Sequence, residues 1–342
     1  MRWAVILAGG RGSRFWPLST ASRPKQLIPL SGPTSTAEQA VNRLAGLVPR
    51  ERTMVVAGPA IVGQLQRLLH LPPENILAEP RAASTAPALV WATCEAWKRD
   101  ADADVLSLHA DWVIADEDAF RETADTALRT ARQHGRLVTV GIVPTRPETG
   151  YGYIVPGEPI DQVARRVARF TEKPDATTAL NLMAEGALWN SGLFAWSASV
   201  LCEQVSEHTP ELAPFLPDLK SGDVAGFFRR LTPVSIDVGL LERSPKVVVL
   251  PGRFTWDDVG TWDALARVRP RDSKGNVGVG PVHFVGAQDC VAWSDGDPMV
   301  VSDVRDLVVV HANGRVLVMP RTAAADLKHI LDALPPQVRD LP

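Results

Sequence analysis

The stretch "WAVILAGGRGSRFWPLS", from Trp3 to Ser19, decides how the rest of this chain is interpreted. Ala4 to Leu7 form a short apolar run that predicts a buried strand, and the run leads directly into Gly9, Gly10 and Gly12. Glycine lets backbone N–H groups approach a ligand closely, and it tolerates positive φ angles. A glycine-rich loop at the end of a buried strand therefore predicts a phosphate-binding site.

Two familiar phosphate loops do not fit this stretch. A P-loop ends in Gly-Lys-Ser/Thr, but Gly12 is followed by Ser13 and Arg14. A dinucleotide-binding fingerprint needs a third glycine at the position that Phe15 occupies, where a side chain would obstruct helix–strand packing. The sequence thus argues against both a Walker-type NTPase and a Rossmann dehydrogenase.

What remains is the pattern GGxGxR, followed by Pro24-Lys25-Gln26. Backbone N–H groups of the loop can hold phosphate oxygens, while Arg14 and Lys25 place full positive charges where a leaving pyrophosphate accumulates negative charge. A glycine loop alone is compatible with a simple tight turn, whereas its combination with these two cations favours phosphate chemistry.

The order of apolar and helical patterns predicts an α/β fold. Strand-like runs at 3–8, 53–57, 104–109 and 137–143 alternate with helical patterns at 37–47, 60–70, 86–99 and 116–134. The strand runs are almost continuously apolar, which is typical of a mainly parallel sheet covered by helices on both faces. Such sheets bind ligands beyond the carboxyl ends of their strands, where the glycine loop and Asp111 both fall.

The C-terminal part has a different pattern. After further helical patterns at 177–185, 198–207, 223–230 and 261–268, short β-rich runs separated by turn residues begin beyond Val268. We expect a domain boundary near Pro270, which gives a catalytic domain at 1–269 and a small β domain at 270–342 with a short helix at 323–334.

Composition excludes several classes of protein. The 342 residues carry a formal net charge of −3, so no domain-wide basic surplus indicates nucleic-acid binding. The apolar run before the glycines is too short for a signal sequence or a membrane span, which favours a cytoplasmic protein. Cys94, Cys202 and Cys290 are far apart in the sequence and form no CxxC pair, which indicates small buried core residues rather than a disulfide framework or a zinc site.

Several further motifs make the chain similar to the sugar-1-phosphate nucleotidylyltransferases, whose opening signature is GGxGxRLxPLT/S followed by PKxx. Within that family the chain resembles the mannose-1-phosphate guanylyltransferases, and the matching motifs run in the family's order from residue 3 to about 276. They are "PKQL" at 24–27, "AEPRAASTAPA" at 78–88, "GYGYI" at 150–154, "FTEKP" at 170–174, "WNSGLF" at 189–194, "SIDVGLLE" at 235–242 and "WDDVGTW" at 256–262.

The resemblance implies a reaction: GTP and mannose 1-phosphate give GDP-mannose and pyrophosphate, by in-line attack of the sugar phosphate and without a covalent enzyme intermediate. It implies a Rossmann-like nucleotidyltransferase domain, a C-terminal left-handed β-helix and a short form without the isomerase domain fused to some relatives. From the residues alone, an antiparallel meander stays open for the C-terminal strands, because their hexapeptide period is poor. We also expect a homodimer in which the C-terminal strands support subunit contact. Two alternatives stay open: transfer between other substrates, such as thymidylyl transfer to glucose 1-phosphate, and a regulatory protein that binds nucleotide sugars without turnover.

The resemblance also assigns residues. Because one phosphate attacks another, a divalent cation such as Mg²⁺ is expected to reduce their repulsion. Its expected ligands are Asp111 and Asp258, with Asp257 as the adjacent alternative. The expected hexose phosphate contacts are Tyr151, Gly152, Glu172, Lys173 and Asn190. The expected nucleotide contacts are Leu7, Ala8, Gly9, Gly10, Gly12, Ser13, Arg14, Lys25, Glu79, Ser84 and Thr85.

Glu79 is the expected reader of the base, because one carboxylate can accept from both guanine N1–H and the exocyclic amine. Ser84, Thr85 and Ala86 mark an expected helix start, whose free N–H groups could approach the base or ribose. The chain departs from the family pattern at two places beside this pocket. It has "HADW" where PADH is usual, and Ser84 where asparagine is usual.

Overall fold

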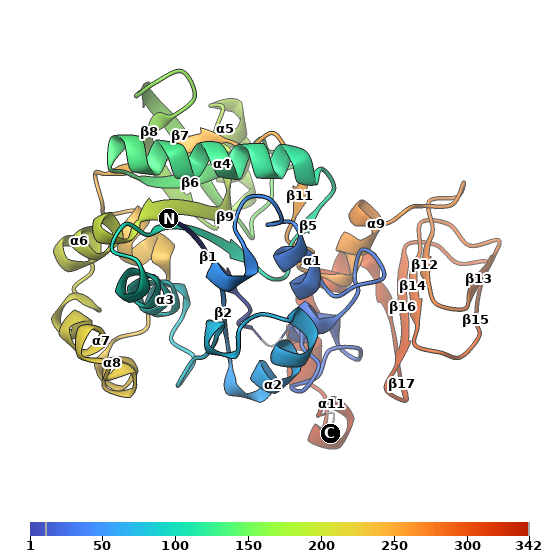
Figure 1. The fold of residues 1–342 in the computed structure, drawn as a ribbon. Coiled ribbons are helices and arrows are strands. Elements are labelled where there is room, and N and C mark those ends of the chain that lie inside the picture. Colours follow the sequence, from blue (N-terminus) through green and yellow to red (C-terminus); the bar gives the residue numbers. More distant parts are fainter. Residues whose placement is uncertain (11, 341–342) are drawn as a thin grey trace. The chain divides into compact units, whose positions relative to one another are not determined.

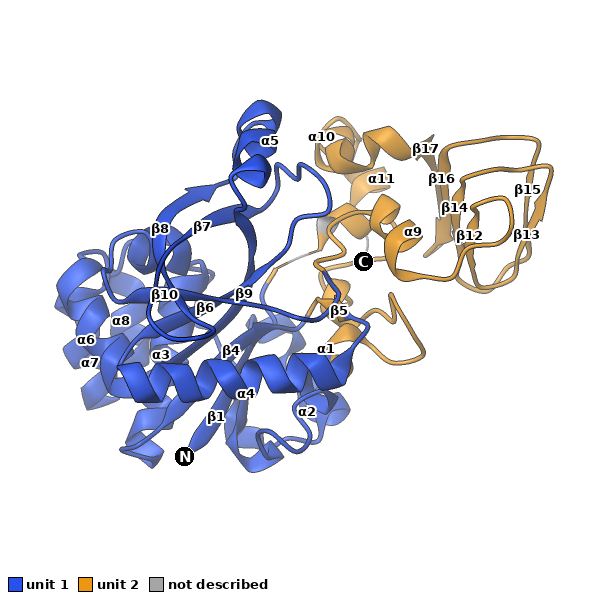
Figure 2. Ribbon diagram, turned by 90° about the horizontal axis from the view of Figure 1, so that it is seen from above, with its two compact units in different colours: residues 1–9, 40–110, 114–256 blue, residues 10–39, 111–113, 257–342 orange. Residues whose placement is uncertain are grey.

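The computed structural model describes residues 1–10 and 12–340, with the side chain of Ser13 left aside. The chain folds into two compact units that are interleaved along the sequence (Figure 2). Unit 1 comprises 1–9, 40–110 and 114–256, and unit 2 comprises 10–39, 111–113 and 257–342. Unit 2 therefore contains all described residues of the expected C-terminal domain together with three segments that precede it.

The α/β fold that the sequence predicts is confirmed, and the sheet at the centre of unit 1 is mixed in strand direction (Figure 1). Its strands are, in spatial order, β3 (Ile76–Ala78), β2 (Thr53–Ala57), β1 (Arg2–Leu7), β4 (Asp104–His109), β9 (Leu188–Ser197), β6 (Leu137–Ile142), β10 (Val247–Pro251), β8 (Arg165–Glu172) and β7 (Gly152–Pro159). The pairs β3–β2, β2–β1, β1–β4 and β6–β10 are parallel, whereas β9 runs antiparallel to both β4 and β6.

Helices cover both faces of the central part of this sheet, so β1, β2, β4 and β6 are almost wholly buried, whereas no residue of β8 is fully buried. Alternate side chains of β1, namely Trp3, Val5 and Leu7, pack in one cluster with α3 (Thr85–Arg99). The opposite face is covered by α4 (Glu117–His134), as Figure 1 shows. The remaining helices of unit 1 are α2 (Pro59–Leu69), α5 (Ala176–Ala184), α6 (Ala198–His208), α7 (Leu216–Ser221), α8 (Val224–Arg230) and a π-helical segment at Asp237–Leu241.

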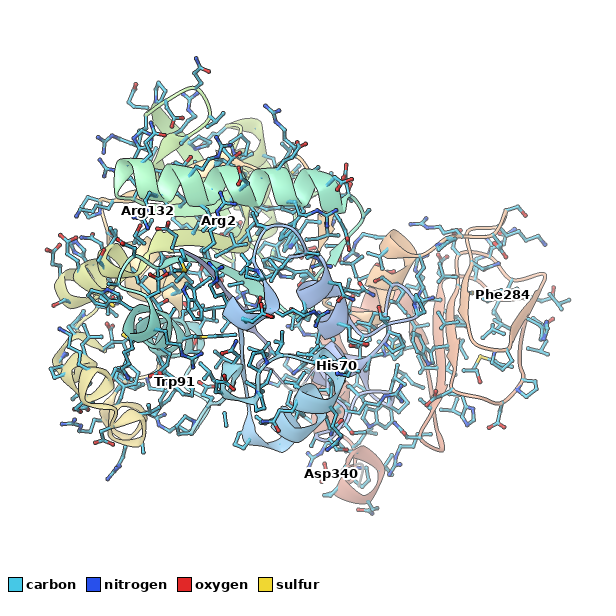
Figure 3. All side chains as sticks on the ribbon, in the orientation of Figure 1. Arg2, His70, Trp91, Arg132, Phe284 and Asp340 are labelled. Atoms are coloured by element: carbon cyan, nitrogen blue, oxygen red, sulfur yellow. The ribbon has the colours of Figure 1, made fainter. Side chains whose placement is uncertain are left out.

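Local sequence explains where the long helix α4 begins and ends. The Asp116 carboxylate accepts a hydrogen bond from the Ala119 N–H at 2.9 Å, which caps the first turn. Gly135 ends the helix in the left-handed conformation with a φ of 56°. Buried side chains of α3 and α6 fill the other face of the sheet, among them Trp91, which is labelled in Figure 3. The Trp91 ring packs edge-on against Phe228, with the ring centres 5.6 Å apart.

Unit 2 combines the phosphate-loop region with the C-terminal strands. In the C-terminal part the chain passes alternately between two sheets, one with β12 (Val277–Val279), β14 (Val291–Ser294) and β16 (Leu307–Ala312), the other with β13 (Val282–Val285) and β15 (Met299–Ser302). These strands are parallel to their neighbours, and β17 (Arg315–Pro320) adds an antiparallel edge. Helices α9 (Leu265–Val268), α10 (Leu327–Asp332) and α11 (Pro336–Arg339) accompany them.

One hydrophobic cluster joins the two parts of unit 2. Phe15, Trp16 and Leu18 of the loop region pack with Trp262 and with Val291 and Trp293 of the C-terminal strands. The Trp262 ring lies 5.0 Å from Phe15 and 5.8 Å from Trp293. The segment that follows the glycine loop therefore shares its core with residues that come more than 240 positions later in the sequence.

Three short elements lie where the chain passes between the units: α1 (Thr36–Asn42), β5 (Val113–Ile114) and β11 (Trp256–Asp257), the last two forming a two-stranded pair. Cys94, Cys202 and Cys290 are buried free thiols, as predicted. Within the described residues, no helix combines the length and apolar character that a bilayer crossing requires.

Candidate active site

The glycine loop is shaped by close backbone packing against Lys25. Gly10 and Gly12 have positive φ angles of 99° and 58°. A Cβ atom on Gly12 would lie 2.6 Å from the Lys25 Cβ and 2.8 Å from its backbone nitrogen, so only glycine fits there. Of the loop residues expected to bind phosphate, the side chain of Ser13 lies outside the part of the chain that the structure describes.

Lys25 is a buried cation that gathers two predicted residues around it. It begins a 3₁₀ turn (Lys25–Leu27), and the residue is only 6% exposed. Its ammonium donates to Asp111 Oδ2 at 2.8 Å and also to the backbone oxygen of Asp258. A buried ammonium requires such partners. The structure thus brings Lys25, Asp111 and Asp258, all in unit 2, into one cluster.

Arg14 stands beside the same aspartate. Its guanidinium donates to the Gly260 oxygen at 3.5 Å. A Cβ built on Gly260 would lie 3.0 Å from Asp258 Oδ2 and 3.3 Å from the Arg14 guanidinium, so the carboxylate and the guanidinium flank the same glycine. The cluster therefore contains two cationic side chains and two carboxylates, which is an arrangement suited to a polyphosphate with a bound cation.

A second group of predicted residues lies in unit 1, on the hairpin of β7 and β8. Gly152 pairs with Glu172 in the ladder, and a Cβ on Gly152 would lie 2.6 Å from Glu172 Oε2. The Glu172 carboxylate forms an ion pair with Lys173 at 2.9 Å. Lys173 has a φ of 47° and its N–H donates to the Tyr151 oxygen at 3.2 Å. The backbone pairing therefore places Glu172 and Lys173 opposite Gly152 and Tyr151 at the open end of the hairpin.

Asn190 on β9 is held at both ends of its amide group. Its Oδ1 accepts from the Thr139 hydroxyl at 2.9 Å, and its Nδ2 donates to Asp237 Oδ1 at 2.7 Å. One amide hydrogen then remains to meet a ligand. Burial, and secondarily the negative charge of Glu172, raise the pKa of Asp237 from 3.8 to about 6.

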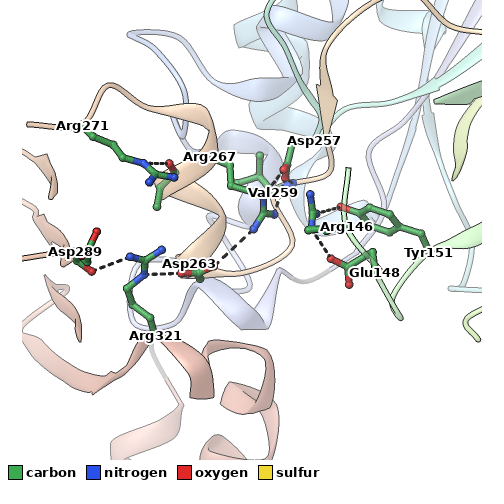
Figure 4. A network of polar contacts seen from close by, with 11 residues as sticks. Arg146, Glu148, Tyr151, Asp257, Val259, Asp263, Arg267, Arg271, Asp289 and Arg321 are labelled. Atoms are coloured by element: carbon green, nitrogen blue, oxygen red, sulfur yellow. Dashed lines mark hydrogen bonds and ion pairs between the residues drawn. The ribbon is translucent and has the colours of Figure 1, made fainter. Parts of the chain in front are cut away.

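Tyr151 is packed rather than free. Its ring contacts Trp189 at 5.2 Å and Trp256 at 5.1 Å, both nearly edge-on. The Arg146 guanidinium lies 5.0 Å from the Trp189 ring and donates to the Tyr151 hydroxyl at 3.4 Å (Figure 4). These aromatic contacts form a packed wall next to Gly152, the first residue of β7.

The segment expected to meet the base is also in unit 1. Glu79 follows β3, and its Oε1 accepts from the Ala83 N–H at 3.2 Å. Burial raises the pKa of Glu79, although the Ala83 N–H and the charge of Arg81 act in the opposite direction. Arg81 donates to the backbone oxygens of Phe228 and Leu231 at 2.6 and 2.9 Å, which ties this segment to the end of α8.

Ser84 precedes α3 with a φ of 71°, and the helix begins at Thr85, close to the start that the sequence predicts. The Ala86 N–H, which the sequence predicts to be free, donates to the Val234 oxygen at 3.2 Å. Thr85 Oγ1 accepts from the Ile236 N–H at 2.9 Å. Because Asp237 comes next in the chain, the segment 234–237 connects the expected base-binding residues to Asn190.

Comparison with known proteins shows the family to which this chain belongs. The sequence profile described as Nucleotidyl transferase matches residues 3–275. This chain belongs to the nucleotidyl transferase family. It is 36% identical to the mannose-1-phosphate guanylyltransferase of Escherichia coli K12, over 97% of this chain and 73% of that protein. It is 35% identical to ManC of Salmonella typhimurium, also a mannose-1-phosphate guanylyltransferase, over the same shares of the two chains.

A solved structure extends the likeness to three dimensions. A crystal structure described as mannose-1-phosphate geranyltransferase from Thermus thermophilus superposes with a TM-score of 0.91 at 35% identity. The match covers 97% of this nucleotidyl transferase and 98% of the Thermus chain. The similarity therefore includes the C-terminal strands as well as the sheet of unit 1.

Nucleotidyl transferases of this kind generally use a divalent metal, and the donor set of unit 2 fits one. No group of three or more His, Cys, Asp and Glu side chains suited to a metal occurs in the described ranges. Mg²⁺ needs no such cage, because it commonly takes one or two carboxylates and completes its shell with water and substrate phosphates. Asp111 and Asp258 supply two carboxylates beside the predicted phosphate loop.

Two residues of this nucleotidyl transferase have roles that the sequence did not reveal. Asp237 lies within the quoted motif "SIDVGLLE" but could not be connected to Asn190, 47 positions away. Asp257 was considered only as an alternative metal ligand, yet its carboxylate is bound by the Arg267 guanidinium at 2.6 and 3.0 Å. Trp112, one of the departures from the family pattern, is a buried side chain with 3% exposure.

Proposed function

We propose that this protein transfers GMP from GTP to mannose 1-phosphate, releasing pyrophosphate and forming GDP-mannose. A phosphate oxygen of the sugar phosphate forms a bond to the α-phosphorus of GTP while the bond from that phosphorus to the β-phosphate oxygen breaks. The relatives named for this activity support the choice of substrates. The observation that carries the proposal is the cluster of buried Lys25 with Asp111 and Asp258 next to the glycine loop.

The cluster around Lys25 and the glycine loop act on the triphosphate. Arg14 and Lys25 offset the negative charge that grows on the leaving pyrophosphate, and the backbone of the loop from Leu7 through Gly9, Gly10 and Gly12 holds phosphate oxygens. Asp111 and Asp258 hold Mg²⁺, which when bound reduces the repulsion between the two reacting phosphates. No general base is required, because a sugar phosphate is already ionised near neutral pH.

The residues of unit 1 select the other groups. Glu172 and Asn190 bind hexose hydroxyls, Lys173 binds the sugar phosphate, and Gly152 leaves room for the ring beside the wall formed by Tyr151. Glu79 accepts from the two donors on the guanine edge, with Ser84 and Thr85 near the ribose. The Glu79 carboxylate already accepts from a backbone N–H, which supports its role as an acceptor directed at donors.

The broader features of the proposal concern the whole chain. We assign catalysis to residues 1–269 and place a left-handed β-helix in 270–342, where parallel strands alternate between two sheets. We further propose a cytoplasmic homodimer. These assignments concern the domains, the location and the oligomeric state of the protein, and they do not depend on the reaction proposed above.

The test is pyrophosphate release by the purified chain with Mg²⁺, using GTP, dTTP, UTP and ATP against mannose 1-phosphate and glucose 1-phosphate. We expect turnover mainly with GTP and mannose 1-phosphate, and a loss of about 100-fold or more in kcat for Asp258→Asn. Glu79→Gln should reduce the preference for GTP over ATP. Preference for dTTP and glucose 1-phosphate would contradict the substrate assignment, and nucleotide binding without any turnover would indicate the regulatory alternative.

A further inference from the structure

The loop that carries Asp258 contains a strained residue. Val259 has a φ of 45°, a conformation that β-branched residues rarely adopt because their side chains crowd the backbone. Its side chain is fully buried in the cluster that includes Phe15 and Trp262. Such a conformation persists only where surrounding contacts impose it. Contacts of the neighbouring residues therefore hold the Val259 backbone at this φ angle.

Asp257 supplies the restraining contact. The Val259 N–H donates to Asp257 Oδ1 at 2.8 Å. The Asp257 residue is 7% exposed, and Arg267 binds its carboxylate through two nitrogens, at 2.6 Å to Oδ2 and 3.0 Å to Oδ1. A two-point guanidinium–carboxylate pair fixes the direction of the carboxylate as well as its distance. The acceptor of the Val259 N–H is therefore itself held in place by α9.

Asp258 lies between these restraints. On one side Asp257 is bound by Arg267, on the other Val259 is anchored in the core, and the Asp258 backbone oxygen accepts from Lys25. The backbone at Asp258 is thus held at three points. This leaves the carboxylate beside Gly260 and Arg14, where a metal ligand is expected.

The restraint continues into the C-terminal part of unit 2 (Figure 4). Arg267 also pairs with Asp263 at 3.7 Å, and Asp263 Oδ1 accepts from Arg321 Nε at 2.6 Å. Arg321 begins the 3₁₀ helix after β17 and donates to the Asp289 backbone oxygen at 2.8 Å. Alternating charges therefore extend from the C-terminal strands to Asp257.

We propose that Asp257 and Arg267 are positioning residues that fix the metal ligand Asp258 through Val259, and that Arg321 supports Arg267 through Asp263. This inference rests on the proposed function, in which Asp258 holds the divalent cation. The ion pairs from Arg321 through Asp263 and Arg267 to Asp257 would then serve catalysis as well as the stability of the fold.

The test compares Arg267→Met with Arg267→Lys, Asp257→Asn and the more distant Arg321→Met. Arg243→Met is the matched control, because Arg243 makes an equally short two-point pair with Glu211 at 2.8 and 2.9 Å on the surface of unit 1. Two readouts are needed: steady-state kinetics, and binding of the Mn²⁺–GTP complex measured by enhancement of water-proton relaxation. Thermal unfolding of each variant establishes that it is folded.

We expect Arg267→Met to lower kcat and to weaken Mn²⁺–GTP binding by about 10- to 100-fold, with KM for mannose 1-phosphate changed less than about threefold. Arg267→Lys should recover part of the loss because it keeps the charge. Asp257→Asn keeps an acceptor for the Val259 N–H and should lose less than Arg267→Met. Arg321→Met should show a smaller loss in the same direction, and Arg243→Met should match the wild type in both readouts.

Wild-type Mn²⁺–GTP binding and kcat in folded Arg267→Met and Arg321→Met would overturn the inference. An equal loss in Arg243→Met would also overturn it, because the effect would then be one of general stability. If the wild-type chain binds Mn²⁺–GTP but shows no turnover with mannose 1-phosphate, the proposed function fails, while weaker Mn²⁺–GTP binding in Arg267→Met would still support the positioning role.

Discussion

Asp237 is a carboxyl group held between the Asn190 amide and the negative charge of Glu172. Removing its ionised form from water, together with repulsion from Glu172, raises its pKa to about 6. At neutral pH the carboxyl group is nevertheless mostly ionised, because pH 7 lies above this pKa. An ionised carboxylate beside the proposed hexose site can accept a hydrogen bond from a sugar hydroxyl.

This environment predicts a pH-dependent stability. Because the folded-state pKa lies above the ordinary value of 3.8, the folded chain binds the proton more tightly, and stability falls as pH rises from about 4 to about 6. Asp237→Asn keeps an oxygen for the Asn190 N–H but carries no charge. We expect this variant to be more stable than the wild type by about 1 to 3 kcal/mol at pH 7 and equal to it below about pH 4.

Urea unfolding of both proteins at a series of pH values measures this difference. A stability difference that is the same at pH 4 and pH 7 would mean that the carboxyl of Asp237 does not titrate in this window, and the electrostatic explanation would be wrong.

At the residue scale the sequence predicted most of the cluster around Lys25 but not its supports. Lys25 could be selected because a cation after a glycine loop suits phosphate binding, whereas Asp111 and Asp258 were selected from motifs that resemble those of a known family. Asp237 and Arg267 could not, since their partners Asn190 and Asp257 are set by the way strands and turns fold together. The residues that flank an aspartate in the sequence do not indicate which distant side chain its carboxylate binds.

At the scale of elements, the hairpin of β7 and β8 brings Gly152 against Glu172. The Glu172 oxygen would lie 2.6 Å, and the Phe170 ring 3.0 Å, from a Cβ on Gly152. Since the Glu172 side chain is flexible, Gly152→Ala should fold normally and displace the carboxylate. Gly157, on the same strand, offers a control because its added Cβ would meet Ala168 at 3.2 Å, away from Glu172 and Lys173.

We therefore predict that Gly152→Ala raises KM for mannose 1-phosphate by about tenfold, because a displacement of about 1 Å in a binding group has effects of this order or larger. KM for GTP should stay within about twofold, and Gly157→Ala should leave both constants unchanged. Initial-rate measurements with each substrate varied separately would decide this, and an unchanged KM for the sugar phosphate in Gly152→Ala would argue against a role for Glu172.

Most elements of the first half follow from local pattern. The helix expected at 116–134 is observed at Glu117–His134. Its ends agree well with the prediction because a capping aspartate precedes the helix and a glycine follows it in the sequence. Strand direction was not visible: β9 enters antiparallel between β4 and β6, although its apolar pattern differs little from that of a parallel strand. The π-helical segment Asp237–Leu241 is too short for any periodicity to be recognised.

At the scale of the whole molecule, the two units are interleaved in the sequence while each has a core of its own. The sequence placed a linear boundary near Pro270 because composition changes there. It contained no sign that Phe15 and Trp16 pack with Trp293, since contacts between residues this far apart leave no local pattern. This shared core explains how C-terminal residues such as Arg321 come to support the Asp258 loop.

The proposed homodimer is tested at the same scale. The C-terminal strands expose valines that a subunit contact would cover, namely Val285, Val300, Val316 and Val318, each more than half exposed. Light scattering should give twice the chain mass of 37.0 kDa. Val316→Lys combined with Val318→Lys should shift the protein towards the monomer, and a wild-type monomer at high concentration would contradict the proposal.

In the proposed mechanism, Asp111 and Asp258 hold a divalent cation while Glu172, Lys173 and Asn190 hold the hexose phosphate. A crystal structure with GDP-mannose and Mn²⁺, in which anomalous scattering locates the metal, tests this most directly. We predict a metal peak within about 2.3 Å of carboxylate oxygens of both aspartates, with the mannose in contact with Glu172 and Asn190. A metal bound away from both aspartates, or a mannose without contact to the β8 and β9 residues, would contradict this claim.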